Sequence, residues 1–385
     1  EGINGKPYGN GLKLGRMNLS SSPGLPYVKE GFTKRSQLVE GTDWLRPSPR
    51  LRSELEDLDT QLHTGIMKLH TFRACLKDEK RPIEKVLENK TRLFCASPMH
   101  YSLYERSLAG EFLWRFVENR QKLWHAVGID AHSLEWNDLG QYLFRFRNVI
   151  CGDYSRFDST ISPYIIQRAY DIVSACYDGI DRWLLKRLGQ FCGSVTLETK
   201  GAIIQPLSGN PSGCQLTTEI NCIANILNWM YVVVRAVRSS GENFDIDDFD
   251  RECSLVVYGD DFVFTCSDLV RSRLVSFDDF ARLGFVIANP DGSLLSWCKQ
   301  KEVTFLKRRF ARGVEGFPPS HFVGQFPLEL IWQVPLFAHK GATPADFENT
   351  FRAVLIETAL HGRVKYQELV DWCRKLHKYE AYEFV

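Results

Sequence analysis

The feature that most constrains this chain is the stretch from Ser254 to Phe264, which reads SLVVYGDDFVF. Apolar residues, many of them β-branched or aromatic, enter and leave it, and such runs are typical of buried strands. Gly259 between the two runs permits the backbone conformation of a tight turn. The pattern therefore predicts a β-hairpin that carries Asp260 and Asp261 at its tip.

Two adjacent carboxylates between apolar walls need a counter-charge, because burying like charges side by side costs free energy. A hard divalent cation such as Mg²⁺ or Mn²⁺ binds carboxylate oxygen and would supply that charge. For the turn taken alone, an ordinary solvated Gly-Asp-Asp turn is the alternative. The apolar flanks favour the metal site.

The composition limits the classes of protein to which this chain can belong. The 385 residues, 44% of them hydrophobic, can bury a sizeable core and suggest two or three domains or one large subdivided domain. Lys and Arg number 48 against 47 Asp and Glu, so a nucleic-acid-binding surface would have to be local. The 11 cysteines include no Cys-x-x-Cys pair, which favours a reducing compartment over a zinc site or disulfide scaffold. The chain begins at Glu1 without a signal sequence, so we expect it to be excised from something longer.

A second acidic motif lies between Val149 and Thr160. An apolar strand is predicted to end at Asp153, whose carboxylate would then project towards a metal ion. Asp158 follows near the start of a helix predicted over residues 159–177, where it could hydrogen-bond a ligand hydroxyl. The alternative for Asp158 is a helix N-terminal cap.

A flexible loop from Ser208 to Gly213 leads into a long helix predicted from Cys214 to Arg238. The helix N-terminus and the preceding glycines suit contact with phosphate or ribose. Thr217 and Asn221 are four residues apart and share a helix face, either for a ligand or as an interhelical hydrogen-bond pair. The polar side chains of this helix argue against a transmembrane segment.

Two other stretches are candidates for contact with phosphates. Residues 68–92 carry Lys and Arg at intervals of about four and could line a channel for polyphosphate. Pro82 breaks any helix there, so a strand or loop is predicted. The alternative to a polyphosphate channel is a charged hairpin in solvent that binds no ligand. The loop from Ser20 to Tyr27 could hold a phosphate backbone through its N–H groups, or simply connect its neighbours.

Periodicity and composition predict the remaining elements. Residues 102–125 show the spacing of an amphipathic helix. The others are a solvated acidic loop over residues 244–250, a helix leading into a strand over 277–289, a strand between basic residues over 303–310, and a mainly helical end beyond Pro327.

Taken in order, these motifs resemble those of a viral RNA-dependent RNA polymerase of the picornavirus-like group, and caliciviruses share part of the pattern. Each motif alone is a weak or moderate match, but six of them in the right order along nearly the whole chain are specific. The residues that carry the resemblance are Ser20 to Tyr27, Lys77 with Arg81, Lys85 and Arg92, Asp153 with Asp158, Ser212 and Gly213 with Thr217 and Asn221, Tyr258 to Asp261, and Phe305 to Arg308.

The resemblance implies an α/β fold of the α+β kind, a closed right hand with fingers, palm and thumb. The palm would be an antiparallel sheet flanked by helices. The fingers would be residues 1–110 and 191–206, the catalytic palm residues 111–190 and 207–311, and the thumb residues 312–385.

The resemblance also implies a reaction, in which the primer 3′ oxygen attacks the α-phosphorus of a nucleotide and pyrophosphate leaves, with two Mg²⁺ or Mn²⁺ ions. Asp153, Asp260 and Asp261 would be the catalytic metal ligands. The nucleotide would be bound by Lys77, Arg81, Lys85, Arg92, Asp158, Ser212, Gly213, Thr217 and Asn221, and the RNA by Ser21, Ser22, Gly24, Lys307 and Arg308.

The implied partners are an RNA template and primer, nucleoside triphosphates, a genome-linked protein primer and other replicase proteins, with no transmembrane segment. The same likeness implies release from a viral polyprotein. The place of action would be the host cell cytoplasm, at membrane-associated replication complexes.

Two features depart from the family's pattern. The loop that would receive the template begins at Ser20, much nearer the N-terminus than in the family, so an N-terminal segment is expected to be missing. Where the family often has a lysine proton donor, this chain has Gly292 and no neighbouring lysine. Lys299 or Lys301 could substitute, water could donate the proton, or no acid is needed.

Two other functions compete with RNA synthesis. A reverse transcriptase also places paired aspartates on a palm hairpin, but it normally blocks the 2′-hydroxyl with an aromatic side chain, where Asp158 and Asn221 offer hydrogen bonds. A catalytically silent RNA-binding fragment is the alternative from a different class. Primer extension with Mg²⁺ separates the fragment from the enzyme.

Overall fold

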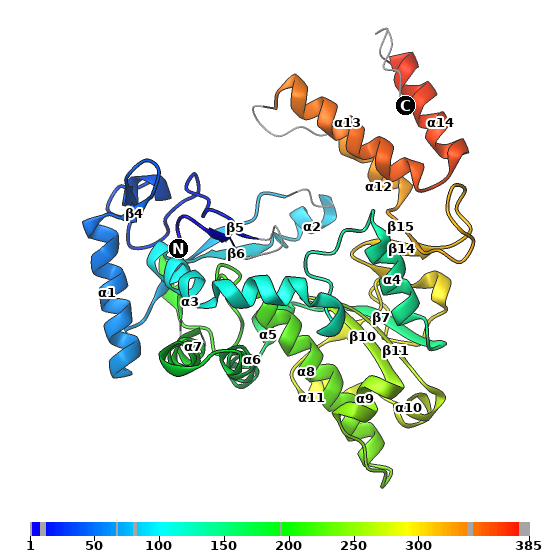
Figure 1. Cartoon of the computed structure of the whole chain (residues 1–385), viewed down its shortest axis with the longest axis horizontal. Helices are drawn as coiled ribbons and strands as arrows, with labels where there is room; N and C mark the ends of the chain where they lie inside the picture. Colours follow the sequence, from blue (N-terminus) through cyan, green and yellow to red (C-terminus); the bar gives the residue numbers. More distant parts are fainter. Residues whose placement is uncertain are drawn as a thin grey trace.

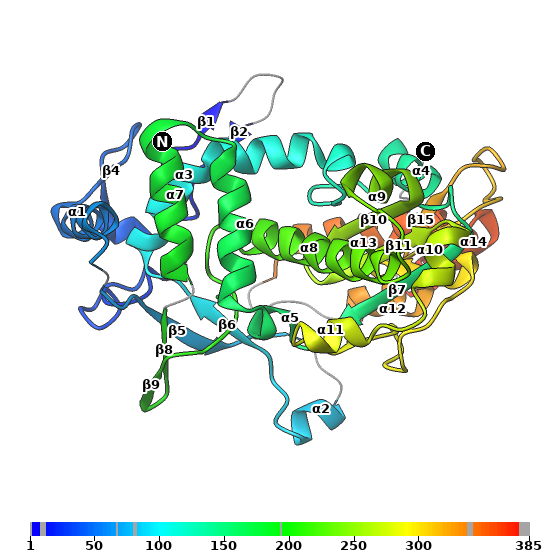
Figure 2. The ribbon, with the colours of Figure 1, turned by 90° about the horizontal axis from the view of Figure 1, so that it is seen from below.

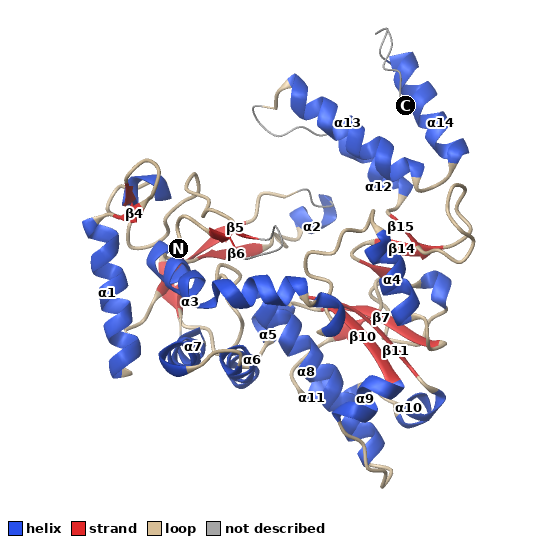
Figure 3. Ribbon diagram, viewed as in Figure 1, coloured by secondary structure: helices blue, strands red, loops and turns tan. Residues whose placement is uncertain are grey.

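The computed structural model describes residues 2–7, 13–66, 68–79, 83–192, 195–336 and 342–376. Three regions follow one another across the molecule, an N-terminal region at the left, a central region, and a C-terminal group of helices at the upper right (Figure 1). Helices and mostly antiparallel sheets alternate in them (Figure 3), which is the α+β class that the resemblance implied.

The N-terminal region is built on a four-stranded sheet of order β6-β5-β8-β9. β5 pairs in parallel with β8, so two segments far apart in the sequence lie side by side (Figure 2). The elements are β1 (Lys6–Pro7), β2 (Lys13–Leu14), β3 (Val39–Glu40), β4 (Arg46–Pro47), α1 (Pro49–Thr64), β5 (Thr71–Leu76), α2 (Ile83–Leu87), β6 (Leu93–Ala96), β8 (Thr196–Thr199) and β9 (Ala202–Ile204).

The central region contains a four-stranded antiparallel sheet of order β10-β11-β7-β12. Its strands are β7 (Asn148–Tyr154), β10 (Cys253–Tyr258), β11 (Asp261–Cys266) and β12 (Ile287–Ala288). The helices are α3 (Met99–Glu118), α4 (Leu134–Leu143), α5 (Phe157–Thr160), α6 (Pro163–Ala175), α7 (Gly179–Cys192), α8 (Thr217–Arg238), α9 (Ile246–Glu252), α10 (Asp268–Arg273) and α11 (Asp278–Arg282).

The alternation of side chains along β11 places a layer on each face of this sheet. Phe262 and Phe264 face α8, where the Trp229 ring stacks on Phe264 with centroids 4.5 Å apart. Val263, between them, belongs to the opposite cluster around Trp136 of α4. Because successive strand residues point to opposite faces, both clusters form on one hairpin and hold it rigidly between two layers.

The chain continues into a small antiparallel sheet and three helices. The sheet has the order β13-β14-β15, with β13 (Thr304–Phe305), β14 (Arg308–Ala311) and β15 (Val323–Gln325). The helices α12 (Leu328–Gln333), α13 (Pro344–Ala359) and α14 (Arg363–Leu376) share a separate apolar cluster. The predicted helical end of the chain is therefore confirmed.

Helix α8 is, within the described parts of the chain, the one helix long and apolar enough to cross a membrane. Of the window that passes this test, 61% is buried inside the protein, where α8 packs against the central sheet. Its position is that of a core helix.

Four predicted elements differ from the structure. The helix predicted over residues 159–177 is broken, because Ser162 accepts a hydrogen bond from Ile165 N–H and Pro163 starts α6 anew. The acidic stretch predicted as a loop contains α9, whose first turn is capped by the Asp245 carboxylate. The strand predicted over residues 303–310 is a hairpin, turned at Leu306 and Lys307, where φ is positive.

The fourth difference lies in the basic stretch of residues 68–92, which contains a short helix, α2, where a strand or loop was predicted. Proline excludes a helix interior but is tolerated in the first turn, so a helix can begin just after Pro82. Pro82 itself lies outside the described residues.

Candidate active site

The three candidate metal ligands lie at one edge of the central sheet. Asp153 is the next-to-last residue of β7, and Asp260 and Asp261 lie at the turn between β10 and β11. β11 pairs with β7 so that Phe262 lies opposite Gly152, which brings both acidic segments to the same edge. Gly259 has a φ of 63°, a left-handed conformation that favours glycine in this turn. The predicted hairpin is confirmed.

Burial is the main cause that raises the pKa of each of the three carboxylates. Burial raises the pKa of Asp153, and the charge of Asp260 raises it further. Burial raises the pKa of Asp261 to about 7, against a hydrogen bond that it accepts from Leu306 N–H at 2.6 Å. The side chains of Asp153 and Asp260 are reached by solvent, yet protein atoms crowd them enough to disfavour the charged form. The site therefore concentrates negative charge that a cation would relieve.

The donor set fits a hard divalent cation, because all its ligand atoms are carboxylate oxygens. None of the three aspartates forms an ion pair with a residue in the described ranges, although Arg92 lowers the pKa of Asp153 and Asp260 through its charge. Their oxygens do not all lie within 4.8 Å of one another, as the ligand atoms of one other described group do.

Asp158 and Asn221 form a hydrogen-bonded pair beside this edge. Asn221 Nδ2 donates to Asp158 Oδ1 at 2.5 Å, and Asn210 Nδ2 donates to Asn221 Oδ1 at 2.9 Å. The alternative reading of Asp158 as a helix cap is not what the structure shows, since α5 has no side-chain cap. Burial raises the pKa of Asp158, and its bond from Asn221 opposes that rise. The charge of Asp260 also raises the pKa of Asp158, so the pair lies near the candidate metal ligands.

The loop before α8 is fixed against the N-terminal sheet. Ser212 Oγ accepts a hydrogen bond from Cys95 N–H at 3.0 Å, and a side chain at Gly213 would clash with the Cys95 carbonyl oxygen. Thr217 Oγ1 donates to the carbonyls of Pro211 and Cys214, at 2.9 and 2.7 Å. Ser212, Gly213 and Thr217 thus shape the loop, and their predicted contacts with a nucleotide stay predictions.

The basic residues predicted to bind the nucleotide do not all lie near the acidic edge. Lys77 and Arg92 both pair with Glu79, at 3.4 and 3.7 Å, and both lower the pKa of Asp158, so their charges lie near the acidic edge. Lys85 is exposed on α2. Arg81 lies outside the described residues.

The predicted RNA-contacting loop is partly solvent-exposed. Ser21 Oγ donates to the Asn18 carbonyl at 3.2 Å, and Ser22, which is exposed, accepts from Gly24 N–H at 3.3 Å. Gly24 is buried, and a side chain there would meet the Ser97 carbonyl oxygen at 2.5 Å. Gly24 therefore packs the loop onto the protein, which leaves Ser21 and Ser22 as the better candidates for a phosphate contact.

Lys307 and Arg308 occupy different positions on the β13–β14 hairpin. Lys307 is exposed at the turn, next to the Leu306 N–H that bonds Asp261. Arg308 Nη1 donates to Glu357 of α13 at 2.7 Å and to the Gly324 carbonyl at 2.8 Å. The Arg308 guanidinium is thus engaged by protein acceptors, whereas Lys307 is exposed, and the RNA contacts predicted for both residues stay predictions.

Neither candidate substitute for the missing lysine lies near Asp153. Cys298 N–H donates to the Val149 carbonyl at 2.9 Å, so Lys299 follows a residue paired with the far end of β7. Val149 and Asp153 are four strand residues apart, about 13 Å at 3.3 Å per residue. Lys301 lies beyond, in a 3₁₀ turn beside a cavity of about 550 Å³ that it shares with Arg309 and Arg312. This placement disfavours both lysines as the proton donor.

Two functional neighbours escaped the sequence reasoning. Cys222 and Asn225, both on α8, contact the backbone of the Gly259–Asp260 turn. Asn225 is one helical turn after Asn221 and so shares its face, which is the signal that could have found it.

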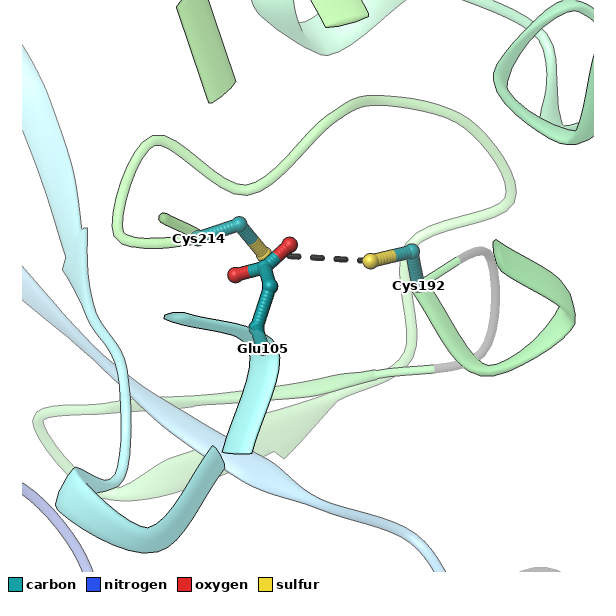
Figure 4. A group of neighbouring side chains, drawn as sticks. All are labelled: Glu105, Cys192 and Cys214. Carbon is teal, nitrogen blue, oxygen red and sulfur yellow. Dashed lines mark hydrogen bonds between the residues drawn. The ribbon is translucent and has the colours of Figure 1, made fainter. Parts of the chain in front are cut away.

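A further buried group lies away from the acidic edge. Glu105 of α3, Cys192 of α7 and Cys214 converge in a fully buried position, and Figure 4 shows the hydrogen bond between the two thiols, 3.9 Å apart. Glu105 accepts from Tyr170 O–H at 2.7 Å and from Gln215 N–H at 2.5 Å. Both carboxylate oxygens are therefore satisfied by protein donors, as a buried polar group requires.

The fold and the acidic edge together define a right-hand nucleic-acid polymerase. The family model described as viral RNA-dependent RNA polymerase matches residues 6–377, and the chain belongs to that family. The solved Sicinivirus 3Dpol RNA dependent RNA polymerase has a similar fold, with a TM-score of 0.77 and 22% identity over 96% of this chain and 74% of that chain. The α+β fold class and the resemblance to picornavirus-like polymerases are confirmed.

Two curated relatives are viral polyproteins. The genome polyprotein of human hepatitis A virus genotype IB (isolate HM175) is 28% identical over 383 residues, 96% of this chain. The replicase polyprotein of acute bee paralysis virus (strain Rothamsted) is 30% identical over 327 residues, 77% of this chain. The chain spans 16% of the length of each of these polyproteins.

Proposed function

We propose that this chain synthesises RNA on an RNA template for a positive-strand RNA virus of the picornavirus-like group. The observation that carries the proposal is the meeting of Asp153 with the Gly259–Asp261 turn on paired strands, in a chain of this polymerase family. Membership of that family also weighs against the reverse transcriptase alternative. The silent RNA-binding fragment remains the alternative that an assay must exclude.

Two divalent cations, Mg²⁺ or Mn²⁺, would be held by Asp153, Asp260 and Asp261, and when bound they would stabilise negative charge on the attacking and leaving oxygens. The residues of the chain then orient the reactants. Asp158 and Asn221 accept from and donate to the ribose hydroxyls, because their side chains already form a polar pair beside the carboxylates. Charges of Lys77 and Arg92 attract the triphosphate to the same edge.

The remaining assignments belong to the same proposal. We divide the chain into fingers (1–110 and 191–206), palm (111–190 and 207–311) and thumb (312–385). Lys307 at its exposed turn would touch the primer backbone, and Ser21 with Ser22 the template. Partners would be RNA, nucleoside triphosphates, a genome-linked protein primer and other replicase proteins released from the same polyprotein. The place of action would be cytoplasmic replication complexes on membranes.

Primer extension tests the function directly. The chain is incubated with an RNA primer–template, nucleoside triphosphates and Mg²⁺, and single-nucleotide addition is followed in time. The proposal expects template-dependent addition that stops when EDTA removes the cation and that Asp260→Asn abolishes. RNA binding by a folded chain, without any addition under Mg²⁺ or Mn²⁺, would establish the silent fragment instead.

A further inference from the structure

The turn that carries Asp260 is held by two side chains of helix α8. Cys222 Sγ accepts a hydrogen bond from Gly259 N–H at 3.1 Å, and Asn225 Nδ2 donates to the Gly259 carbonyl at 2.9 Å. The same amide group lies 3.4 Å from the Asp260 carbonyl oxygen. Cys222 and Asn225 are fully buried. Both backbone groups of Gly259, which face away from the strand ladder at the turn, are therefore satisfied by α8.

The other end of the Asn225 amide reaches the strand that carries Asp153. Asn225 Oδ1 accepts from Tyr154 O–H at 2.9 Å, and Tyr154 directly follows Asp153 on β7. Because backbone carbonyls only accept hydrogen bonds, the amide nitrogen must face the turn and the amide oxygen must face Tyr154. One amide thus joins the two elements that carry the candidate metal ligands.

The same helix carries the ribose-contacting residue. Asn221 lies one turn before Asn225, about 6 Å along the axis at 1.5 Å per residue. Asn221 bonds Asp158, while Asn225 bonds the turn. Two neighbouring turns of one helix therefore hold Asp158 and the Gly259 turn. The helix fixes the separation of these two elements, because moving either of them would break hydrogen bonds to α8.

We propose that Asn225, assisted by Cys222, is a positioning residue that sets the spacing of Asp153 and Asp260 and hence the affinity of their site for divalent cations. The inference rests on the proposed function and deepens it. Neither residue touches the ion, so the effect is that of an outer contact on a ligand. Loss of such contacts typically lowers metal affinity by about 10- to 100-fold.

The central test is Mn²⁺ binding, followed by electron paramagnetic resonance without RNA or nucleotide, so that it is independent of activity. Asn225→Asp keeps the size of the side chain and the acceptor for Tyr154, but places an oxygen against the Gly259 and Asp260 carbonyls. The Mn²⁺ affinity of this variant should fall about 10- to 100-fold. A folded Asn225→Asp variant with the parent's affinity overturns the proposal.

Thr265→Val is the matched control for loss of a buried hydrogen bond. Thr265 lies on the same hairpin, is fully buried, and donates to the Leu143 carbonyl at 2.7 Å, away from the turn. The control should lower the thermal midpoint and leave Mn²⁺ affinity unchanged. An equal loss of affinity in the control and in Asn225→Asp would reduce Asn225 to a structural role.

Cys222 supplies a second pair of variants that decides the matter if Asn225→Asp does not fold. Cys222→Ala removes the acceptor for Gly259 N–H, and Cys222→Ser replaces it with a hydroxyl. Alanine should weaken Mn²⁺ binding, and serine should restore part of it. Parent-like affinity in the alanine variant overturns the proposal.

Asp153→Asn with Asp260→Asn separates this failure from failure of the proposed function. If the doubly substituted chain binds Mn²⁺ like the parent, the metal site is elsewhere, and both the proposed function and the positioning role fall. If the double variant loses binding while the folded Asn225→Asp variant keeps it, the positioning role alone falls.

Discussion

Asp261 and Glu105 share a pKa raised by burial to about 7, yet their surroundings differ. Around Asp261 the charges of Asp260 and Asp153 raise the pKa further, and solvent reaches those two neighbours. Around Glu105 lie Tyr170 and the Gln215 backbone, which donate hydrogen bonds, and no solvent. A group of acids that solvent and cations can reach is suited to bind a cation. For Glu105, burial away from solvent favours the neutral acid, against the hydrogen bonds that it accepts.

The largest effect on activity should come from removing one charge from the group formed by Asp153, Asp260 and Asp261. Asp260→Asn keeps the shape of the turn but removes a metal ligand, so nucleotide addition should fall by about 10³-fold or more. Without divalent cations the same variant should be at least as stable as the parent, because like-charge repulsion is relieved. Rapid single-nucleotide kinetics and thermal unfolding in EDTA measure the two effects. A variant that is as well folded as the parent and adds nucleotides at the parent's rate would refute the metal assignment. We expect the same two effects from Asp153→Asn.

A smaller effect, on the choice of nucleotide, is expected at the hydrogen-bonded pair of Asp158 and Asn221. Asn221→Ala leaves Asp158 without its donor, so the preference for ribo- over deoxyribonucleotides should narrow by about 10- to 100-fold. The measurement is the ratio of kcat/KM for the two nucleotides. Thr265→Val, far from the pair, should keep the parent's ratio. An unchanged ratio in Asn221→Ala would remove the pair from ribose recognition.

The buried carboxyl of Glu105 predicts a pH-dependent stability. The pKa of Glu105 is about 7 in the folded protein and 4.5 ordinarily, so the folded state holds the extra proton between these values. The contribution of Glu105 to the free energy of unfolding is therefore fully present below pH 4.5 and is lost as the pH rises through 7. Glu105→Gln cannot ionise, and can bond both Tyr170 and Gln215 N–H. It should be more stable than the parent by about 3 kcal/mol at pH 8.5, at 1.36 kcal/mol per pKa unit.

Denaturant unfolding of both chains at pH 5 and pH 8.5 measures this difference. The two stabilities should converge at the lower pH. A Glu105→Gln variant that is less stable than the parent at both values would show that Glu105 is ionised in the core.

The smallest effect is expected at Lys299 and Lys301. Because the structure places Lys299 beyond the far end of β7, leucine at either position should change the rate of single-nucleotide addition by less than about twofold. The solvent deuterium effect on that step should also match the parent's. A slower rate together with a smaller isotope effect in either variant would restore that lysine as the proton donor.

The hairpin and the acidic edge could be predicted because their signals are local. Apolar runs on both sides of Gly259 define strands, and a turn glycine between them defines the tip. The pairing of β11 with β7 is not local, and only the order of motifs indicated that Asp153 would meet Asp260. Arg308 shows the limit, because its partner Glu357 lies on a helix far along the chain. No local pattern reveals such a pairing.

Capping residues account for other differences between prediction and structure. Asp245 was taken as part of a solvated loop because its neighbours are acidic, whereas those acids cap and begin α9. Ser162 and Pro163 could have been recognised as a helix start. The helical spacing from Asn221 could have singled out Asn225, but its amide contacts could not be predicted, because they depend on how closely α8 approaches the turn.

The parallel pairing of β5 with β8 has a consequence for synthesis of the chain. Thr71 and Thr196 face each other across the sheet and are 125 residues apart in sequence. At about 5–20 residues per second, roughly 6–25 seconds pass between the emergence of the two strands from a ribosome. During that time β5 has β6 on one side and an open edge on the other, ready to pair with a foreign strand. A nascent chain of this kind therefore has to hold the edge of its first sheet unpaired until β7 and the helices α3 to α7 of the central region have been made.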